Sequence, residues 1–96
     1  MSDKVLNNTN VEDVKKSTSD VEVFGNGDLF QLISKASSKE QGWMKSTKAM
    51  PIRGLGVVIQ VTTQQGKQIA EAVTFVPGAT IGKDDNGLPS IVYGTA

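Results

Sequence analysis

Residues 56–76 have the sequence GVVIQVTTQQGKQIAEAVTFV, in which two runs rich in β-branched residues surround a glycine. Alternating side chains bounded by turn residues are typical of β-strands, and two such runs joined by two residues are typical of a hairpin. We therefore predict an antiparallel hairpin with Gln65-Gly66 as its turn. This turn places Gln64 opposite Lys67 and sets the pairing of all the residues that follow on both strands.

The predicted register gives the hairpin two unlike faces. The first carries small and apolar side chains, namely Val57, Ile59, Val61, Ala70, Ala72 and Val76. The second, which we call the mixed face, carries Val58, Gln60, Thr62, Ile69, Glu71, Val73 and Phe75. A slip of one residue would bury Glu71 beside Ile59, and burying an unpaired charge costs free energy. We predict that the first face packs in the core and that the mixed face stays open to water or to a partner.

Residues 28–36 are predicted to form a helix that covers the first face. Asp28 stands where an N-cap is expected, and Gln31 follows at the spacing of a capping box. The apolar side chains recur at helical spacing, and they are Leu29, Phe30, Leu32, Ile33 and Ala36. Because alanines at the centre of the first face leave room for bulk, this stripe is expected to dock there. Ser37 weakens the helix, which should end before Trp43.

Further strands are predicted around the hairpin. Their ranges are 21–24, 43–50, 79–83 and 90–93. Pro51 should end the second of these at Met50, and residues 84–87, with the sequence DDNG, should form the turn between the last two. The sum is an α+β fold, in which one helix packs on one face of a mostly antiparallel sheet of about five strands.

The length and composition indicate one domain. With 96 residues and 38% hydrophobic content, the chain can build one core but not two. Residues 1–20 are polar and offer few side chains for burial, so they are predicted to be a flexible N-terminal arm. Within it, Asn10 can cap a turn or two of helix that ends at Lys16. Residues 21–96 form the domain, and the alternative for the arm is a strap that orders against a neighbouring subunit.

The chain has neither cysteine nor histidine. Disulfides, thiolate metal sites and the usual base of neutral-pH catalysis are therefore excluded. Ser46 and Lys48 share a strand face, but no neighbouring feature would activate the serine. We expect no enzyme activity, no cofactor and no metal. No apolar run approaches the roughly 20 residues that span a bilayer, and no secretion signal is present, so we expect no membrane contact and a cytoplasmic location.

The net charge is zero, yet the charges are unevenly distributed. Residues 1–28 carry six acids and three bases, whereas residues 35–53 carry five bases and one acid. An aromatic residue beside cations is typical of sites that hold single-stranded nucleic acid or nucleotides. The residues for such a site are Trp43, Lys45, Lys48 and Arg53. The alternative is that the lysines are only solvated and that Trp43 fills the edge of the core.

Three stretches resemble small proteins encoded by tailed bacteriophages, namely GWMKSTKAM at 42–50, VVIQVTTQQ at 57–65 and AEAVTFVPG at 70–78. The resemblance implies a short viral accessory protein that acts by binding a host or viral component. It implies no catalytic residue. A phage-encoded protein of this kind would work in the cytoplasm of the host cell.

The sequence thus predicts a non-enzymatic protein that binds a host or viral protein through the mixed face and residues 43–53. Val58, Val73 and Phe75 would leave an apolar patch on a monomer, so we also expect homo-oligomers. The complete set of predicted binding residues is Trp43, Lys45, Lys48, Arg53, Val58, Gln60, Thr62, Glu71, Val73 and Phe75. Two alternatives stay open: binding of nucleic acid or a small anionic nucleotide through residues 43–53, and a structural role in a virion.

Overall fold

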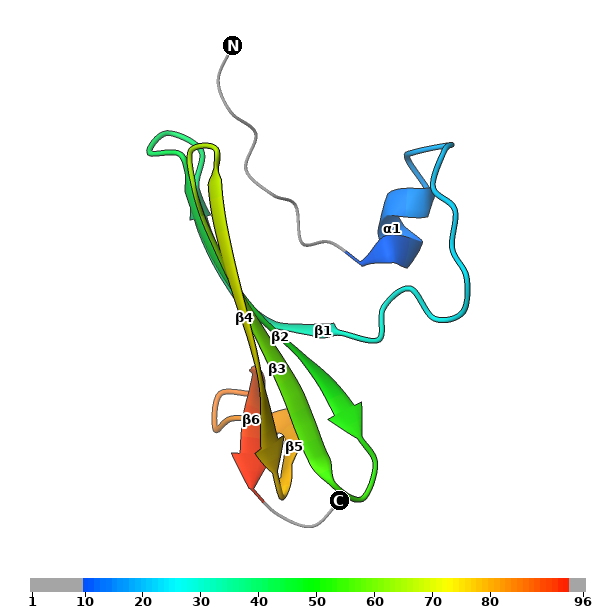
Figure 1. Ribbon diagram of the computed structural model, residues 1–96, viewed down its shortest axis with the longest axis vertical. Coiled ribbons are helices and arrows are strands. Elements are labelled where there is room, and N and C mark those ends of the chain that lie inside the picture. The colour runs from blue at the N-terminus through cyan, green and yellow to red at the C-terminus, as the bar shows by residue number, and fades with distance from the viewer. Residues whose placement is uncertain (1–9, 94–96) are drawn as a thin grey trace.

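The computed structural model describes residues 10–93, and most of them lie in antiparallel strands (Figure 1). Consecutive strands pair into a four-stranded sheet with the order β1-β2-β3-β4. These strands are β1 (Gln31–Ser38), β2 (Trp43–Ile52), β3 (Gly56–Gln65) and β4 (Gln68–Pro77). The last two strands, β5 (Ala79–Lys83) and β6 (Pro89–Tyr93), form a separate two-stranded sheet. Within the described residues, α-helix is limited to α1 (Val11–Lys15).

The hairpin predicted for residues 56–76 is present as β3 and β4, but its register differs by two residues. The loop is Gly66-Lys67, with Gln65 opposite Gln68. Gly66 has a φ of 58°, so it takes the first central position of a type II′ turn, where a positive φ is needed. The predicted turn would have put Gln65 there, where a side chain is strained. A shift of two residues keeps every side chain on its predicted face.

The helix predicted over residues 28–36 is wrong, because this segment leads into and forms most of β1. β1 pairs with β2, with a β-bulge at Ile33 between Leu32 and Ser34. The apolar spacing that suggested a helix also fits an extended strand, and a run this short does not distinguish the two. Serine disfavours a helix interior because its hydroxyl competes for backbone hydrogen bonds, whereas the ladder with β2 stabilises the strand. The fold of residues 10–93 is therefore mostly β, with six strands in two sheets, and not the predicted α+β.

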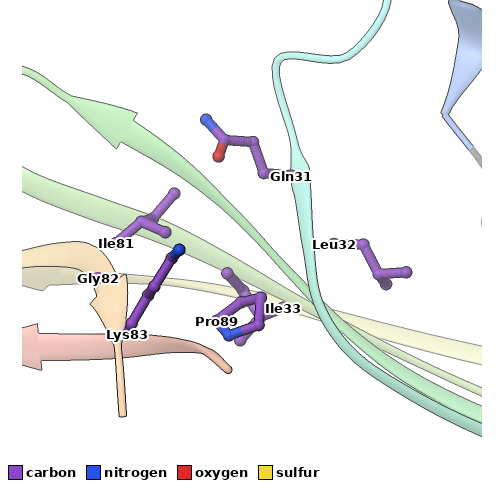
Figure 2. Close-up of a pocket in the computed structure, with 7 residues that line it drawn as sticks. All are labelled: Gln31, Leu32, Ile33, Ile81, Gly82, Lys83 and Pro89. Atoms are coloured by element: carbon purple, nitrogen blue, oxygen red, sulfur yellow. The ribbon is translucent and has the colours of Figure 1, made fainter. Parts of the chain in front are cut away.

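The β5–β6 hairpin covers one end of the face on which the helix was predicted to dock, whereas Val61, Ala70 and Ala72 on the same face are exposed, so this face is only partly in the core. The hairpin packs against β1, β2 and β3. On this face Ala49 and Val57 are both 0% exposed. Figure 2 shows Gln31 and Ile33 directed to the side of the β5–β6 hairpin and Leu32 directed away from it. We call this side of the four-stranded sheet the hairpin face, and the mixed face lies opposite.

The buried core is small. The buried hydrophobic residues are Met44, Ala49, Val57 and Ala79, and two of these four are alanines. Exposed large hydrophobic side chains are more numerous, and they are Val23, Phe24, Leu29, Leu55, Val61, Ile69, Val73, Phe75, Leu88 and Tyr93. The radius of gyration is 15.0 Å, against about 12 Å for a compact chain of this length. Residues 10–93 of one copy thus bury few large apolar side chains.

The segment before β1 also differs from its prediction. The strand expected over residues 21–24 is irregular backbone. Of the predicted N-terminal arm, residues 1–9 lie outside the described part of the chain, and the rest includes α1. The backbone N–H groups of Val11 and Glu12 donate to the carboxylate of Asp28, at 2.7 and 3.4 Å. Asp28 therefore caps the helix that precedes it in the chain, and not the predicted one that would follow it.

The strand predicted over residues 43–50 continues through Pro51 as part of β2. The described pairing of β1 with β2 ends where Gln31 lies opposite Ala49. At Pro51, β2 therefore has no neighbour on that side. Proline is tolerated where a strand is locally an edge, because its missing N–H has no partner to lose.

Candidate interaction surface

The mixed face is built from cross-strand pairs between β3 and β4. Val58 lies opposite Phe75, Gln60 opposite Val73 and Thr62 opposite Glu71. All six residues that the sequence analysis assigned to this face as binding residues therefore do share it. Because β3 lies between β2 and β4, its side chains are shielded from both sides, whereas those of β4 are shielded from one side only.

Three hydrophobic side chains of β4 are exposed on the mixed face. Ile69 is 52% exposed, Val73 is 61% exposed and Phe75 is 46% exposed. We call these three residues the β4 apolar row. Alternate positions on a strand share a face, so the row is a strip that only Glu71 interrupts. Exposed apolar side chains that gather in one patch mark a contact surface more often than isolated ones do.

Phe75 is held in place by a glycine on β3. A Cβ on Gly56 would lie 3.1 Å from Cζ of Phe75 and 2.9 Å from Cα of Pro77. The ring therefore lies directly against the backbone of Gly56, in space that any other residue would fill. The ring is nevertheless 46% exposed.

Glu71 is the only charged residue of β4. Thr62 Oγ1 donates to Glu71 Oε1 at 3.5 Å, and Thr62 itself is buried. On the other side of Thr62 lies Ser46 of β2, whose buried Oγ has no hydrogen-bond partner in the structure.

A family model described as the Lockin family matches residues 1–92. The chain belongs to the Lockin family. No curated protein and no solved structure matches it. Since the family description names no ligand, partner or reaction, the function of this Lockin-family chain is inferred from its own surface.

The aromatic and cationic residues predicted as an anion site do not come together in this Lockin-family chain. Trp43 and Lys45 lie on the hairpin face, whereas Lys48 lies on the mixed face. Arg53 follows the end of β2, about 33 Å along the strand from Trp43 at roughly 3.3 Å per residue. The indole N–H of Trp43 donates to Gln41 Oε1 at 2.7 Å. β2 thus distributes these residues over two faces and two ends of the sheet.

A groove of about 290 Å³ lies between β1 and the β5–β6 hairpin (Figure 2). Its apolar lining includes Ile33, Ile81 and Pro89, and Lys83 is the charged residue at its wall. No site was predicted at these residues from the sequence. The groove exists only because the β5–β6 hairpin packs beside β1, and no local sequence pattern signals that packing.

Residues 10–93 contain no helix that is long and apolar enough to cross a membrane. The same residues contain no group of three or more potential metal ligands of the histidine, cysteine or acidic types. They do contain an exposed ion pair at the end of α1, with Lys16 Nζ 3.5 Å from Asp13 Oδ1.

Proposed function

We propose that the chain is a non-enzymatic protein that binds another protein through β4 and the mixed face. The observation that supports this most is the β4 apolar row, in which Ile69, Val73 and Phe75 are each about half exposed. Removing apolar surface from water contributes about 25 cal/mol per Å². A partner that covers the row is therefore held by apolar burial.

The polar residues around the row suit a protein contact. Interfaces commonly combine an apolar centre with a polar rim. Here Glu71 interrupts the row and Gln60 flanks it on β3, while the buried Thr62 donates to Glu71 from beneath. Burying an unpaired carboxylate costs free energy, so Glu71 selects a partner that offers a hydrogen-bond donor or a cation at this point. The row supplies affinity, and Glu71 supplies specificity.

As the class of partner we propose a host or viral protein. This rests on the resemblance of residues 42–50, 57–65 and 70–78 to small proteins of tailed bacteriophages. The last two stretches fall mainly on β3 and β4, so the resemblance includes the proposed contact surface. Recovery of the protein from infected-cell extract but not from purified particles would support this role. Recovery as a component of the particles would favour a structural role in the virion instead.

The tagged chain used as bait tests the contact surface. Val73→Asp places a charge in the β4 apolar row, and Thr74→Asp places the same charge one residue away on the hairpin face. Both positions are exposed, so both variants should keep the fold, which thermal melts will check. The Val73→Asp bait should lose the proteins that the wild type captures, whereas the Thr74→Asp bait should keep them. Equal capture by the two baits would contradict the proposal.

Salt concentration separates an apolar contact from a phosphate contact. Complexes dominated by phosphate weaken steeply between about 50 and 200 mM salt, whereas apolar protein contacts change little. We expect capture by the wild-type bait to persist at the higher concentration. A steep loss would contradict an apolar contact and would favour binding of nucleic acid instead.

A further inference from the structure

The outer edge of β4 carries backbone groups that do not bond to β3. In a hairpin with a two-residue loop, the residues that flank the loop exchange hydrogen bonds, and bonded pairs then alternate along the ladder. Gln65 and Gln68 flank the loop, so the even-numbered residues of β4 bond to β3. The odd-numbered residues direct their N–H and C=O groups away from the sheet. Pro77 is odd-numbered and has no N–H, which agrees with this alternation.

Four residues of β4 therefore present eight backbone groups along one edge, and they are Ile69, Glu71, Val73 and Phe75. In the part of the chain that the structure describes, none of these groups has a hydrogen-bond partner. β4 also has no bulge against β3 and no lysine. A long and regular edge of this kind is a template for pairing with another strand.

We propose that β4 pairs in antiparallel orientation with β4 of a second copy of the chain. The two four-stranded sheets then join into one sheet of eight strands, with a two-fold axis at Ala72. Because an antiparallel pair of identical strands is symmetric, the assembly closes at two copies. This inference rests on the proposed function, since it names a partner for the same strand.

The sequence of β4 selects one register for this pairing. The residues that exchange hydrogen bonds between the two copies have to be odd-numbered on both strands, because only odd-numbered residues of β4 direct their backbone groups outward. Pairing Glu71 with Glu71 would oppose two carboxylates, which is destabilising. Pairing Val73 with Val73 would put Ile69 opposite Pro77, which has no N–H to donate. The register that sets Ile69 opposite Phe75 and Glu71 opposite Val73 uses all eight groups.

This register places Ala72 of one copy opposite Ala72 of the other. The two residues form a non-hydrogen-bonded pair, in which Cα atoms approach to about 4.5 Å. Alanine fits this close spacing because its side chain is a single methyl group. On the mixed face, Ile69 and Phe75 of the two copies form apolar cross-strand pairs, which cover part of the β4 apolar row.

Single-cysteine variants test the register, because the chain has no cysteine of its own. Ala72→Cys puts two thiols opposite one another, within the Cα separation of about 4.4–6.8 Å that a disulfide spans. Ala70→Cys is the matched control, since it is exposed on the same face but its two copies would lie about 13 Å apart along the strands. Under mild oxidation, Ala72→Cys should form linked dimers about tenfold faster than Ala70→Cys. Equal rates would overturn the register.

Sedimentation of Val73→Pro provides a second test. Val73 directs its N–H outward, so proline there removes a bond to the second copy and leaves the bonds to β3 intact. The molar mass from sedimentation should be twice the chain mass of 10.2 kDa for the wild type, and should equal the mass of one chain for the variant. The far-UV circular dichroism spectrum should be the same for both. A wild-type protein that sediments as a monomer at high concentration would overturn the pairing.

These experiments test self-pairing of β4 and binding through the mixed face independently of each other. If Val73→Asp loses its captured proteins while Ala72→Cys links no faster than Ala70→Cys, then self-pairing is overturned and binding through the mixed face stands. If Ala72→Cys links faster while Val73→Asp captures the same proteins as the wild type, then self-pairing stands and binding through the mixed face is overturned.

Discussion

The two edges of the four-stranded sheet are built differently. β1 has a bulge at Ile33, carries Lys35 and three serines, and contacts β6. β4 is two residues longer, runs beside β3 without a bulge and is exposed at every position except Val76. Bulges, lysines and covering elements keep a strand edge from pairing with other chains. β1 is therefore a protected edge, whereas β4 is an edge left available for a partner.

Gly56→Val should have the largest effect, because it detaches β4 from the sheet and so removes the available edge. A Cβ at this position would lie 2.9 Å from Cα of Pro77, which is backbone and does not move aside easily. We expect the free energy of unfolding to fall by about 4 kcal/mol in a urea titration. Thr63→Val, at an exposed position of the same strand, should change it by only about 0.5 kcal/mol. Similar losses in both variants would show that Gly56 has no special role.

Ala72→Lys should have the next largest effect, because it gives β4 a lysine of the kind that β1 already carries. In the proposed register two lysines would face each other, so the dissociation constant of the dimer should rise at least about tenfold, or about 1.4 kcal/mol. Val73→Lys is a close control, since that lysine would face Glu71 of the second copy and should preserve the dimer. Analytical ultracentrifugation measures both constants. Equal weakening by the two substitutions would contradict the register.

Asp28→Ala should have a smaller effect, on the segment that leads into the protected edge. The variant loses both oxygens that accept from the N–H groups of Val11 and Glu12. Loss of a helix cap costs about 1 kcal/mol, and Asp28→Asn should recover most of it because one acceptor remains. Hydrogen exchange at the Val11 amide reports this locally. Dimer dissociation should not change, and a change would mean that α1 and β4 are coupled.

Lys35→Val should have the smallest effect. It removes one protective feature of β1 but leaves the bulge at Ile33 and the contact with β6. The molar mass from light scattering should therefore equal that of the wild type. Larger assemblies in this variant would show that the lysine alone protects β1.

Which side chains share the mixed face was predictable from the sequence, whereas the register of its two strands and the burial of Thr62 and Gln64 on this face were missed. Alternation in β3 and β4 assigns each side chain to a face, and an error of two residues leaves that assignment intact. The correct loop was also predictable from the sequence, because a type II′ turn needs glycine at its first central position and Gly66 supplies it. Alternation along β2 likewise places Lys45 and Lys48 on opposite faces.

β1 and the available edge could not be predicted in the same way. The apolar spacing in residues 28–36 fits a helix and a strand equally, and only the hydrogen bonds to β2 decide between them. Whether a strand is an edge depends on which strands lie beside it, so the error at β1 left the strand order open. The groove beside Ile33 depends on the same long-range packing, for which no local pattern exists.

The core is small, and Met44 and Val57 are its largest fully buried side chains. The lifetime of the protein in the cell should therefore depend on its concentration. With β4 paired as proposed, folding is linked to association by mass action, and the melting temperature rises with protein concentration. Few copies per cell would leave most chains single, marginally folded and open to proteases. Abundant synthesis would therefore protect the protein from degradation, and the level of expression would decide how long each molecule survives.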